Sequence, residues 1–364
     1  MNKDKWKNGI GILIIFLAVF KYYGTYFSLP NMSKYIMIVS LVLATLLIFE
    51  NRKNYNIIHF AFLGLAGIQF VLSKNITMVY TYYLCLGLFA LEFRTVIKWF
   101  IIISTALFSI YLLSNILGIH PTEYLEGRND FGFGNPNTAF ISMFMIWSAF
   151  FYYIFYSEKK IDFIVLFLMI FLMYTQTMTR TGLLTAILTV VAFIILKLVD
   201  VRKKIPSYLI ASFPALMSLL SVVITVFLSN NYLINKVLSH RPIYWNSYLM
   251  HSSKGINLFG YAPNIRDILF TQRMPLDSGY IWSLYSMGIV VFVALIAMMC
   301  YTLYQLCLEN KKDEILLIVS ILIYCFAESI MVDLPTNIGL ILIVYGVSKV
   351  RIKSIFPVKK SKRV

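Results

Sequence analysis

Apolar runs of about 20 residues recur from one end of the chain to the other, and they limit the possible folds strongly. A helix of about 20 residues crosses the ~30 Å hydrocarbon core of a bilayer. Apolar residues make up 60% of the 364 positions and charged residues only 13%, against roughly 25% charged residues in soluble proteins. Because a helix satisfies its own backbone amides in lipid, the sequence predicts an all-α polytopic membrane protein.

The apolar runs predict about 12 transmembrane helices in a single integral membrane domain over residues 1–364. The first run is longer than the core of a signal peptide and no small-residue cleavage site follows it, so we expect it to remain as a span. The predicted spans are residues 9–27, 33–49, 57–73, 76–93, 99–117, 138–156, 161–177, 181–199, 207–228, 279–305, 315–332 and 337–348.

The basic residues predict which side of the membrane each connector faces. They gather in alternate connectors and at both chain ends, for example at 202–204 and 349–364. The positive-inside rule makes this face cytoplasmic and puts both termini there. A loop at 118–137, a short link at 178–182 and a long segment at 229–278, between the ninth and tenth spans, then face outward from the cytoplasmic membrane. The net charge of +16 therefore reflects topology, and we expect no nucleic-acid partner.

Five arginines lie on the predicted outer face, where topology requires no basic residue. A guanidinium binds phosphate or carboxylate through two parallel hydrogen bonds, whereas lysine serves equally well as a topology signal. Outward-facing arginines therefore favour recognition of an anionic ligand. They are Arg128, Arg180, Arg241, Arg266 and Arg273.

The stretch FGFGNPN at 131–137 follows Arg128 closely and leads into the sixth span. Its two glycines permit a sharp turn and close approach of the backbone to a ligand. We expect Asn137 or Thr138 to cap the sixth span, whose free amides favour an anion. Alternatively, the stretch only seals a helix end while Arg128 reaches lipid headgroups. Arg180, in the 178–182 link, either faces a cavity or partner or reaches the headgroups in the same way.

The long outer segment contains two further groups of interest. Arg241 and Trp245 are one helical turn apart, so a guanidinium and an indole can share a face. The Trp245 ring suits a sugar face or, equally, an interfacial aromatic belt. Asp277 stands where the tenth span begins, as a general base near the membrane surface or as a plain helix N-cap.

The remaining ionisable groups predict no metal site. The outer carboxylates are not closely paired in the sequence, so arginines would act on a diphosphate where other enzymes use a divalent cation. We therefore expect neither a metal nor another cofactor. Glu328, within the predicted eleventh span, is either functional or the partner of an arginine in a structural ion pair.

Five motifs follow one another along the chain: Arg128 with FGFGNPN, TRTG at 179–182, Arg241-x-x-x-Trp245, the FGY turn at 259–261 and LDSGYIWSLYSMG at 276–288. This ordered set resembles the Wzy-type polysaccharide polymerases of the O-antigen ligase and polymerase superfamily. Asn135 stands where that family often has histidine. Asp277 stands where the ligases have a histidine, which favours the polymerases.

This resemblance implies a GT-C-type glycosyltransferase that joins undecaprenyl-diphosphate-linked repeat units on the outer membrane face, with inversion. A flippase and a chain-length regulator are the implied protein partners. Arg128, Arg180 and Arg241 would bind the diphosphate, with Arg266 and Arg273 as further members of the cluster. Asn137 would also contact substrate, Asp277 would activate the acceptor hydroxyl, and Trp245 and Tyr280 would shape the sugar site.

Three other functions remain open from the sequence. A ligase that attaches finished polymer to an acceptor would share the fold and the chemistry. A flippase for the same lipids would need its cations in a central cavity reachable from both sides, whereas here they lie in outer segments. A permease or sensor without chemistry is the third alternative.

Overall fold

The computed structural model describes residues 3–27, 30–251, 255–262 and 275–350. Within these ranges the chain is helical apart from one short hairpin and connecting turns, so the predicted all-α class is confirmed. The elements are α1 (Lys3–Tyr26), α2 (Pro30–Glu50), α3 (Ile57–Ser73), α4 (Thr77–Leu88), α5 (Phe93–Ile116), β1 (Tyr124–Leu125), β2 (Arg128–Asn129), α6 (Pro136–Ile154), α7 (Lys160–Thr177), α8 (Arg180–Leu198), α9 (Lys204–Phe227), α10 (Tyr232–Val237), α11 (Arg241–Asn246), α13 (Gly279–Leu308), α14 (Lys312–Tyr324) and α15 (Leu340–Ser348).

Every predicted span contains one of these helices, but the helices differ in length. Among the described residues, eight are long and apolar enough to cross a membrane: α1, α2, α5, α6, α7, α8, α9 and α13. The other four, α3, α4, α14 and α15, have 17, 12, 13 and 9 residues. The protein is thus a multi-pass membrane protein, and the count of twelve spans stays a prediction.

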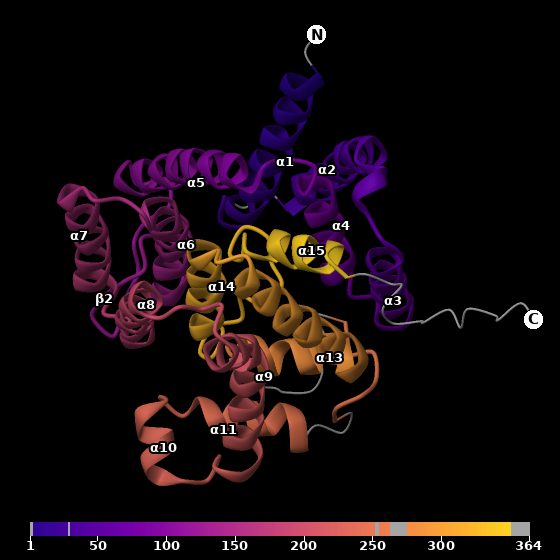
Figure 1. Cartoon of the computed structure of the whole chain (residues 1–364). Helices are drawn as coiled ribbons and strands as arrows, with labels where there is room; N and C mark the ends of the chain where they lie inside the picture. Colours follow the sequence, from indigo (N-terminus) through magenta and orange to yellow (C-terminus); the bar gives the residue numbers. More distant parts are fainter. Residues whose placement is uncertain (1–2, 28–29, 252–254, 263–274, 351–364) are drawn as a thin grey trace, which may run out of the picture.

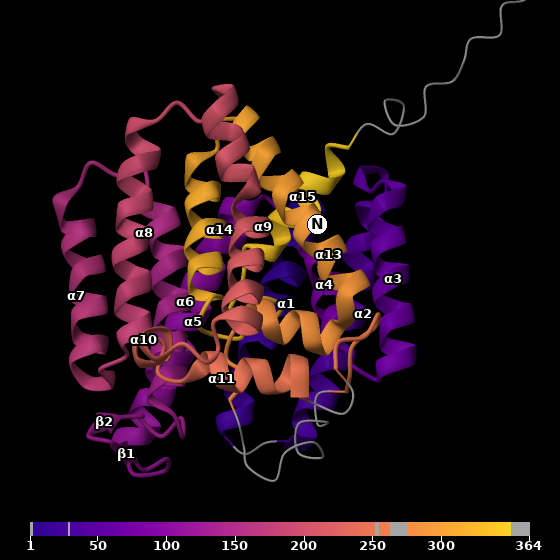
Figure 2. The same cartoon turned by 90° about the horizontal axis from the view of Figure 1, so that it is seen from below.

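The short helix α14 lies at the centre of the bundle, surrounded by longer helices (Figures 1 and 2). It packs against α6, α8, α9 and α13, and nearly all of its side chains are buried. The peripheral helix α7 instead leaves large apolar side chains such as Phe167 and Leu172 uncovered. A helix that is apolar all round is stable when protein or lipid covers every face. This fits α14 inside the bundle and α7 at its edge.

An irregular buried segment, residues 325–339, connects α14 to α15. The predicted eleventh span, 315–332, is therefore wrong in its second half, because its helix ends at Tyr324. Hydrogen bonds from neighbouring side chains satisfy the non-helical backbone: Thr81 donates to the Val332 carbonyl at 2.9 Å and Asn337 to the Met331 carbonyl at 2.7 Å. Such backbone is tolerated at membrane depth only inside protein or beside a cavity.

The helix α13 is interrupted at Gly288, where φ is 81° and ψ is 167°. A turn within the segment 229–278, which the sequence predicts to face outward, fills the interruption. The amide of Ile289 donates to the Asn257 carbonyl at 3.0 Å, and the amide of Tyr261 donates to the Ser286 carbonyl at 3.1 Å. The predicted FGY turn is confirmed, since Gly260 has a φ of 73° and its Cα packs directly on this break.

The segments predicted to face outward gather at one end of the bundle. Figure 2 shows the hairpin β1–β2 and the helices α10 and α11 at the same end, with the link between α7 and α8 beside them. The link between α8 and α9 lies at the opposite end. The candidate site is built at the first of these ends.

Candidate functional site

One buried carboxylate organises the FGFGNPN loop. The side chain of Asp130, which is fully buried, accepts hydrogen bonds from the amides of Glu123, Gly132 and Gly134 at 2.8, 2.9 and 2.8 Å. Both glycines have positive φ, 80° and 72°, and a Cβ on Gly132 would lie 2.7 Å from the His120 carbonyl oxygen. The glycines therefore permit the turn itself. The Asp-x-Gly spacing typical of side-chain-to-backbone turns is the signal by which Asp130 could have been found.

Arg128 extends from the hairpin that precedes this loop. Its strand β2 pairs with β1 around a two-residue turn at Glu126 and Gly127, and both turn residues have positive φ, as such hairpins require. The guanidinium lies 3.3 Å from the exposed Glu126 carboxylate. Its Nε atom is buried and has no hydrogen-bond partner among the described residues. This buried donor of Arg128 is therefore unsatisfied by the described part of the chain.

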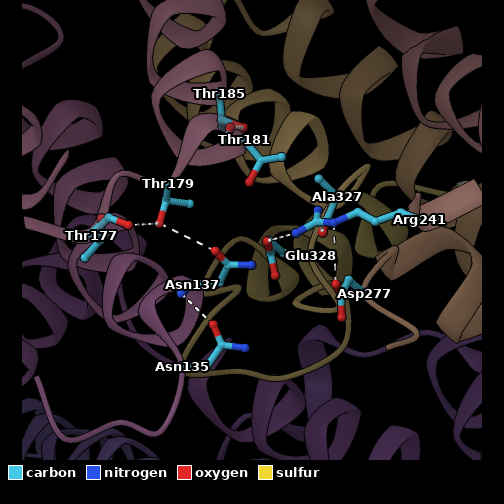
Figure 3. Close-up of polar contacts among 10 residues, drawn as sticks. All are labelled: Asn135, Asn137, Thr177, Thr179, Thr181, Thr185, Arg241, Asp277, Ala327 and Glu328. Atoms are coloured by element: carbon cyan, nitrogen blue, oxygen red, sulfur yellow. Dashed lines mark hydrogen bonds and ion pairs between the residues drawn. The ribbon is translucent and has the colours of Figure 1, made fainter. Parts of the chain in front are cut away.

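The N-terminus of α6 is capped by Asn135, so the expectation that Asn137 or Thr138 caps this helix is wrong. The Asn135 side chain accepts from the Asn137 amide at 2.8 Å, and Pro136 occupies the first helical position, where its missing N–H costs nothing. The Asn137 side chain instead accepts a long hydrogen bond from Thr179, at 3.5 Å, which links α6 to the start of α8 (Figure 3).

Arg128, Arg180 and Arg241 line one cavity of about 810 Å³, together with Asn137. The three arginines come from β2, from the first position of α8 and from the first position of α11, so three separate segments contribute to one wall. The other lining residues are Glu126, Tyr174, Thr175, Met178, Thr181 and Ser239. The three arginines that the resemblance assigns to one diphosphate site thus line the same cavity in the folded chain, and their role there stays a prediction.

Arg180 is the most available cation of the three. Its side chain is exposed, and no ion pair or hydrogen bond joins it to the described part of the chain. The side chain of the preceding residue, Thr179, accepts no hydrogen bond from the first amides of α8. A free guanidinium beside uncapped helix amides is an arrangement that suits an anion.

Arg241, by contrast, is already paired with two carboxylates. Its Nη2 lies 3.1 Å from Glu328 Oε1 and its Nε lies 3.5 Å from Asp277 Oδ2, while Nη1 donates to the Ala327 carbonyl (Figure 3). The side chain of Glu328 is 6% exposed and that of Asp277 is 29% exposed. Of the two alternatives for Glu328, the structure thus favours the partner of an arginine in a structural ion pair. Asp277 is the looser partner, on the accessible side of Arg241.

Tight backbone packing brings Asp277 to Arg241. The amide of Gly279 donates to the Cys325 carbonyl at 2.7 Å, and a Cβ on Gly279 would lie 2.9 Å from the Glu328 carbonyl oxygen. The N-cap of α13 is Ser278, whose hydroxyl accepts from the Ile281 amide, so the alternative that Asp277 is only a helix cap is wrong. The Asp277 carboxylate faces Arg241 instead.

Trp245 and Tyr280 do not line a sugar site in this structure. Both side chains are 0% exposed. The Trp245 ring packs edge-on against Phe326, with centroids 6.0 Å apart, and the Tyr280 hydroxyl donates to the Leu322 carbonyl at 3.0 Å. Both expectations are corrected for the same reason, which is burial against the centre of the bundle: the Trp245 ring attaches α11 to the segment that follows α14, and the Tyr280 hydroxyl attaches α13 to α14 itself. Arg241 and Trp245 do share one helix face, as expected, and that face is buried.

Arg266 and Arg273 lie outside the described residues. Within the described ranges, no cluster of three or more histidine, cysteine or acidic side chains could hold a metal ion. No protein-family model, curated protein or solved structure matches the chain. Its function must therefore be inferred from the cavity that Arg128, Arg180 and Arg241 line.

Proposed function

We propose that the protein is a polysaccharide polymerase that joins undecaprenyl-diphosphate-linked repeat units on the outer face of the cytoplasmic membrane. It would belong with the Wzy-type polymerases and share their GT-C-type architecture. A flippase that delivers the repeat units and a regulator of chain length would be its partners. The single observation that carries the proposal is that three arginines from separate segments line one cavity at one end of a membrane-embedded bundle.

A diphosphate is the ligand that this cavity fits by charge and by size. Arg180 is unpaired among the described residues, and Arg128 keeps a buried Nε without a partner. Guanidinium groups form charge-assisted, bidentate hydrogen bonds with phosphate oxygens. The volume of about 810 Å³ lies within the range of pockets that enclose small organic ligands, so it has room for a diphosphate and adjoining sugars.

The proposed reaction is one inverting displacement. The acceptor hydroxyl attacks the anomeric carbon of the donor, a glycosidic bond forms, and the bond from that carbon to the diphosphate oxygen breaks. The leaving undecaprenyl diphosphate takes the electron pair, and Arg128 and Arg180 stabilise its developing charge. Asp277 accepts the proton of the acceptor hydroxyl.

Arg241 connects the diphosphate site to Asp277, the proposed base. Glu328 and the Ala327 carbonyl fix the inner side of its guanidinium, whereas Asp277 holds Nε at 3.5 Å and is partly exposed. A bound phosphate oxygen would compete with Asp277 for that edge. A shift of the Asp277 carboxylate from Arg241 toward the acceptor hydroxyl would couple occupation of the diphosphate site to activation of the acceptor.

The proposal is tested with purified protein in vesicles and lipid-linked repeat units as the only substrate. Arg180→Ala should lower the rate of polymer formation by about 100-fold, the typical cost of removing one group that stabilises developing charge. The matched control is Arg202→Ala, because Arg202 pairs with Asp200 at the opposite end of the bundle and should leave the rate unchanged.

The same assay separates the proposal from its rivals. A ladder of products longer than two repeat units, formed without any other acceptor, supports a polymerase. Transfer only to a separate acceptor would indicate a ligase. Movement of repeat units across the vesicle membrane with no new glycosidic bond would indicate a flippase and overturn the proposal.

A further inference from the structure

An apolar groove of about 320 Å³ runs between α8 and α9. One wall is a stripe of side chains from Ala192 of α8 to Val199, the residue that follows this helix, and the other is a stripe of α9 side chains from Pro206 to Phe213. Within each stripe the residues follow one another at intervals of three and four, so they share one helix face. Ile315 and Val319 of α14 form the floor.

The groove exists because α8 and α9, although consecutive in the chain, stand apart. α14 packs against both of them and lies between them in Figures 1 and 2. The space between two helices that pack on a third is covered only if a side chain or another molecule fills it. Every groove-lining residue is apolar, so the surface suits a hydrocarbon chain.

The face of α8 that forms the groove also leads to the cavity lined by the three arginines. Continued at the same three- and four-residue intervals, it passes from Ala192 through Leu188 and Thr185 to Thr181, which lines that cavity. Along this face the side chain of Leu188 is exposed, whereas Thr185 is buried at its edge. From Thr181 to Val199 this face spans ~27 Å at 1.5 Å per residue, close to the ~30 Å of a bilayer core.

We propose that this groove holds the polyprenyl chain of the lipid-linked substrate while the diphosphate occupies the cavity. The inference rests on the proposed function and deepens it, because it assigns the tail of the same substrate. A chain anchored at the cavity must cross more than one leaflet to reach Val199. A phospholipid acyl chain from the same leaflet reaches only about half of the ~30 Å core, whereas an undecaprenyl chain is long enough.

Binding of two prenyl diphosphates to the purified full-length protein tests this inference. Ala192→Trp fills the groove, and Val190→Trp is the matched control because Val190 lies on the opposite face of α8 and is exposed. Ala192→Trp should raise the Kd for undecaprenyl diphosphate by about 10-fold, which corresponds to 1.4 kcal/mol of lost apolar contact. The Kd for geranyl diphosphate, too short to reach Ala192, should not change in either variant.

The alternative outcomes are distinct. An unchanged Kd for undecaprenyl diphosphate in Ala192→Trp would overturn the inference, as would equal losses for both ligands. So would loss of co-purified phospholipid with no effect on undecaprenyl diphosphate, because the groove would then be a site for bulk lipid. If Ala192→Trp does not fold, Phe213→Ala on the α9 wall should produce the same loss selective for the long chain.

Failure of the proposed function would look different. Binding that is selective for undecaprenyl diphosphate, without polymer formation, would support the polyprenyl chain in the groove and refute the polymerase function. Polymer formation with equal affinity for both prenyl diphosphates would refute only the assignment of the polyprenyl chain to the groove.

Discussion

The guanidinium of Arg241 lies 3.1 Å from the carboxylate of Glu328, although the two residues are 87 positions apart in the chain. Arg241 begins α11 and Glu328 follows the end of α14, so the pair joins the segment between α9 and α13 to the centre of the bundle. Both side chains are at least nine-tenths buried. Removing one member of such a pair leaves the other as an uncompensated buried charge.

Glu328→Ala should therefore destabilise the protein by about 3 kcal/mol, within the range for breaking a buried ion pair. The measurement is the thermal unfolding midpoint in detergent. Glu126→Ala is the matched control, because the Glu126 carboxylate, 86% exposed, also pairs with an arginine and should contribute less than 1 kcal/mol. Equal midpoints for the two variants would contradict a structural role for Glu328.

The double variant Arg241→Met with Glu328→Leu separates stability from function. Apolar side chains of similar volume often replace a buried ion pair without loss of stability, so the midpoint should recover relative to Glu328→Ala. Polymer formation should be lost, because the guanidinium that would bind a phosphate oxygen of the substrate is gone. Recovery of both stability and activity would show that Arg241 only supports the fold.

Arg180→Lys tests bidentate recognition of the diphosphate. Lysine keeps the charge but lacks the planar fork of donors, so the KM for the lipid-linked donor should rise about 10-fold, equal to 1.4 kcal/mol. The unfolding midpoint should not change, because Arg180 has no ion-pair or hydrogen-bond partner in the described part of the chain. An unchanged KM would mean that Arg180 acts as a point charge or does not touch the substrate.

Asp130→Asn should disrupt the FGFGNPN loop. Oδ1 of Asp130 accepts from the Glu123 and Gly132 amides and Oδ2 accepts from the Gly134 amide. Asparagine offers one oxygen, so at least one amide would face an NH₂ group, at a cost of about 1–3 kcal/mol. We expect Asp130→Asn to lower the rate of polymer formation more than the control Glu123→Gln, whose side chain is exposed. Activity equal to that of the control would show that the loop tolerates the mismatch.

Gly288→Ala should prevent folding of the outer half of α13. A Cβ at this position would lie 2.4 Å from the amide nitrogen of Gly260, and φ at Gly288 is 81°, so both space and backbone conformation exclude a side chain. The control is Gly67→Ala on α3, where nothing lies within 4 Å of the added Cβ. Protease sensitivity of the 255–262 segment measures the effect, and wild-type resistance in Gly288→Ala would contradict the proposed packing.

The features that the sequence predicted correctly depend on short stretches of chain. Each apolar run contains a helix, because hydrophobicity along about 20 residues decides whether a segment enters lipid. The turn at 259–261 was predictable from Gly260, since glycine adopts positive φ without strain. The cap of α6 was misassigned by two residues, because Asn135, Asn137 and Thr138 are all acceptable caps and the position of Pro136 decides between them.

What the sequence alone determined is therefore the membrane class, the approximate helices and the segments that bear Arg128, Arg180 and Arg241. Tertiary structure alone decided that Arg241 is paired with Asp277 and Glu328 while Arg180 is not. It also decided that Trp245 and Tyr280 are buried and that the helix of the predicted eleventh span stops at Tyr324. The physical reason is that hydropathy and turn preference act between neighbours in the chain. Ion pairing and burial depend on which distant segments come into contact.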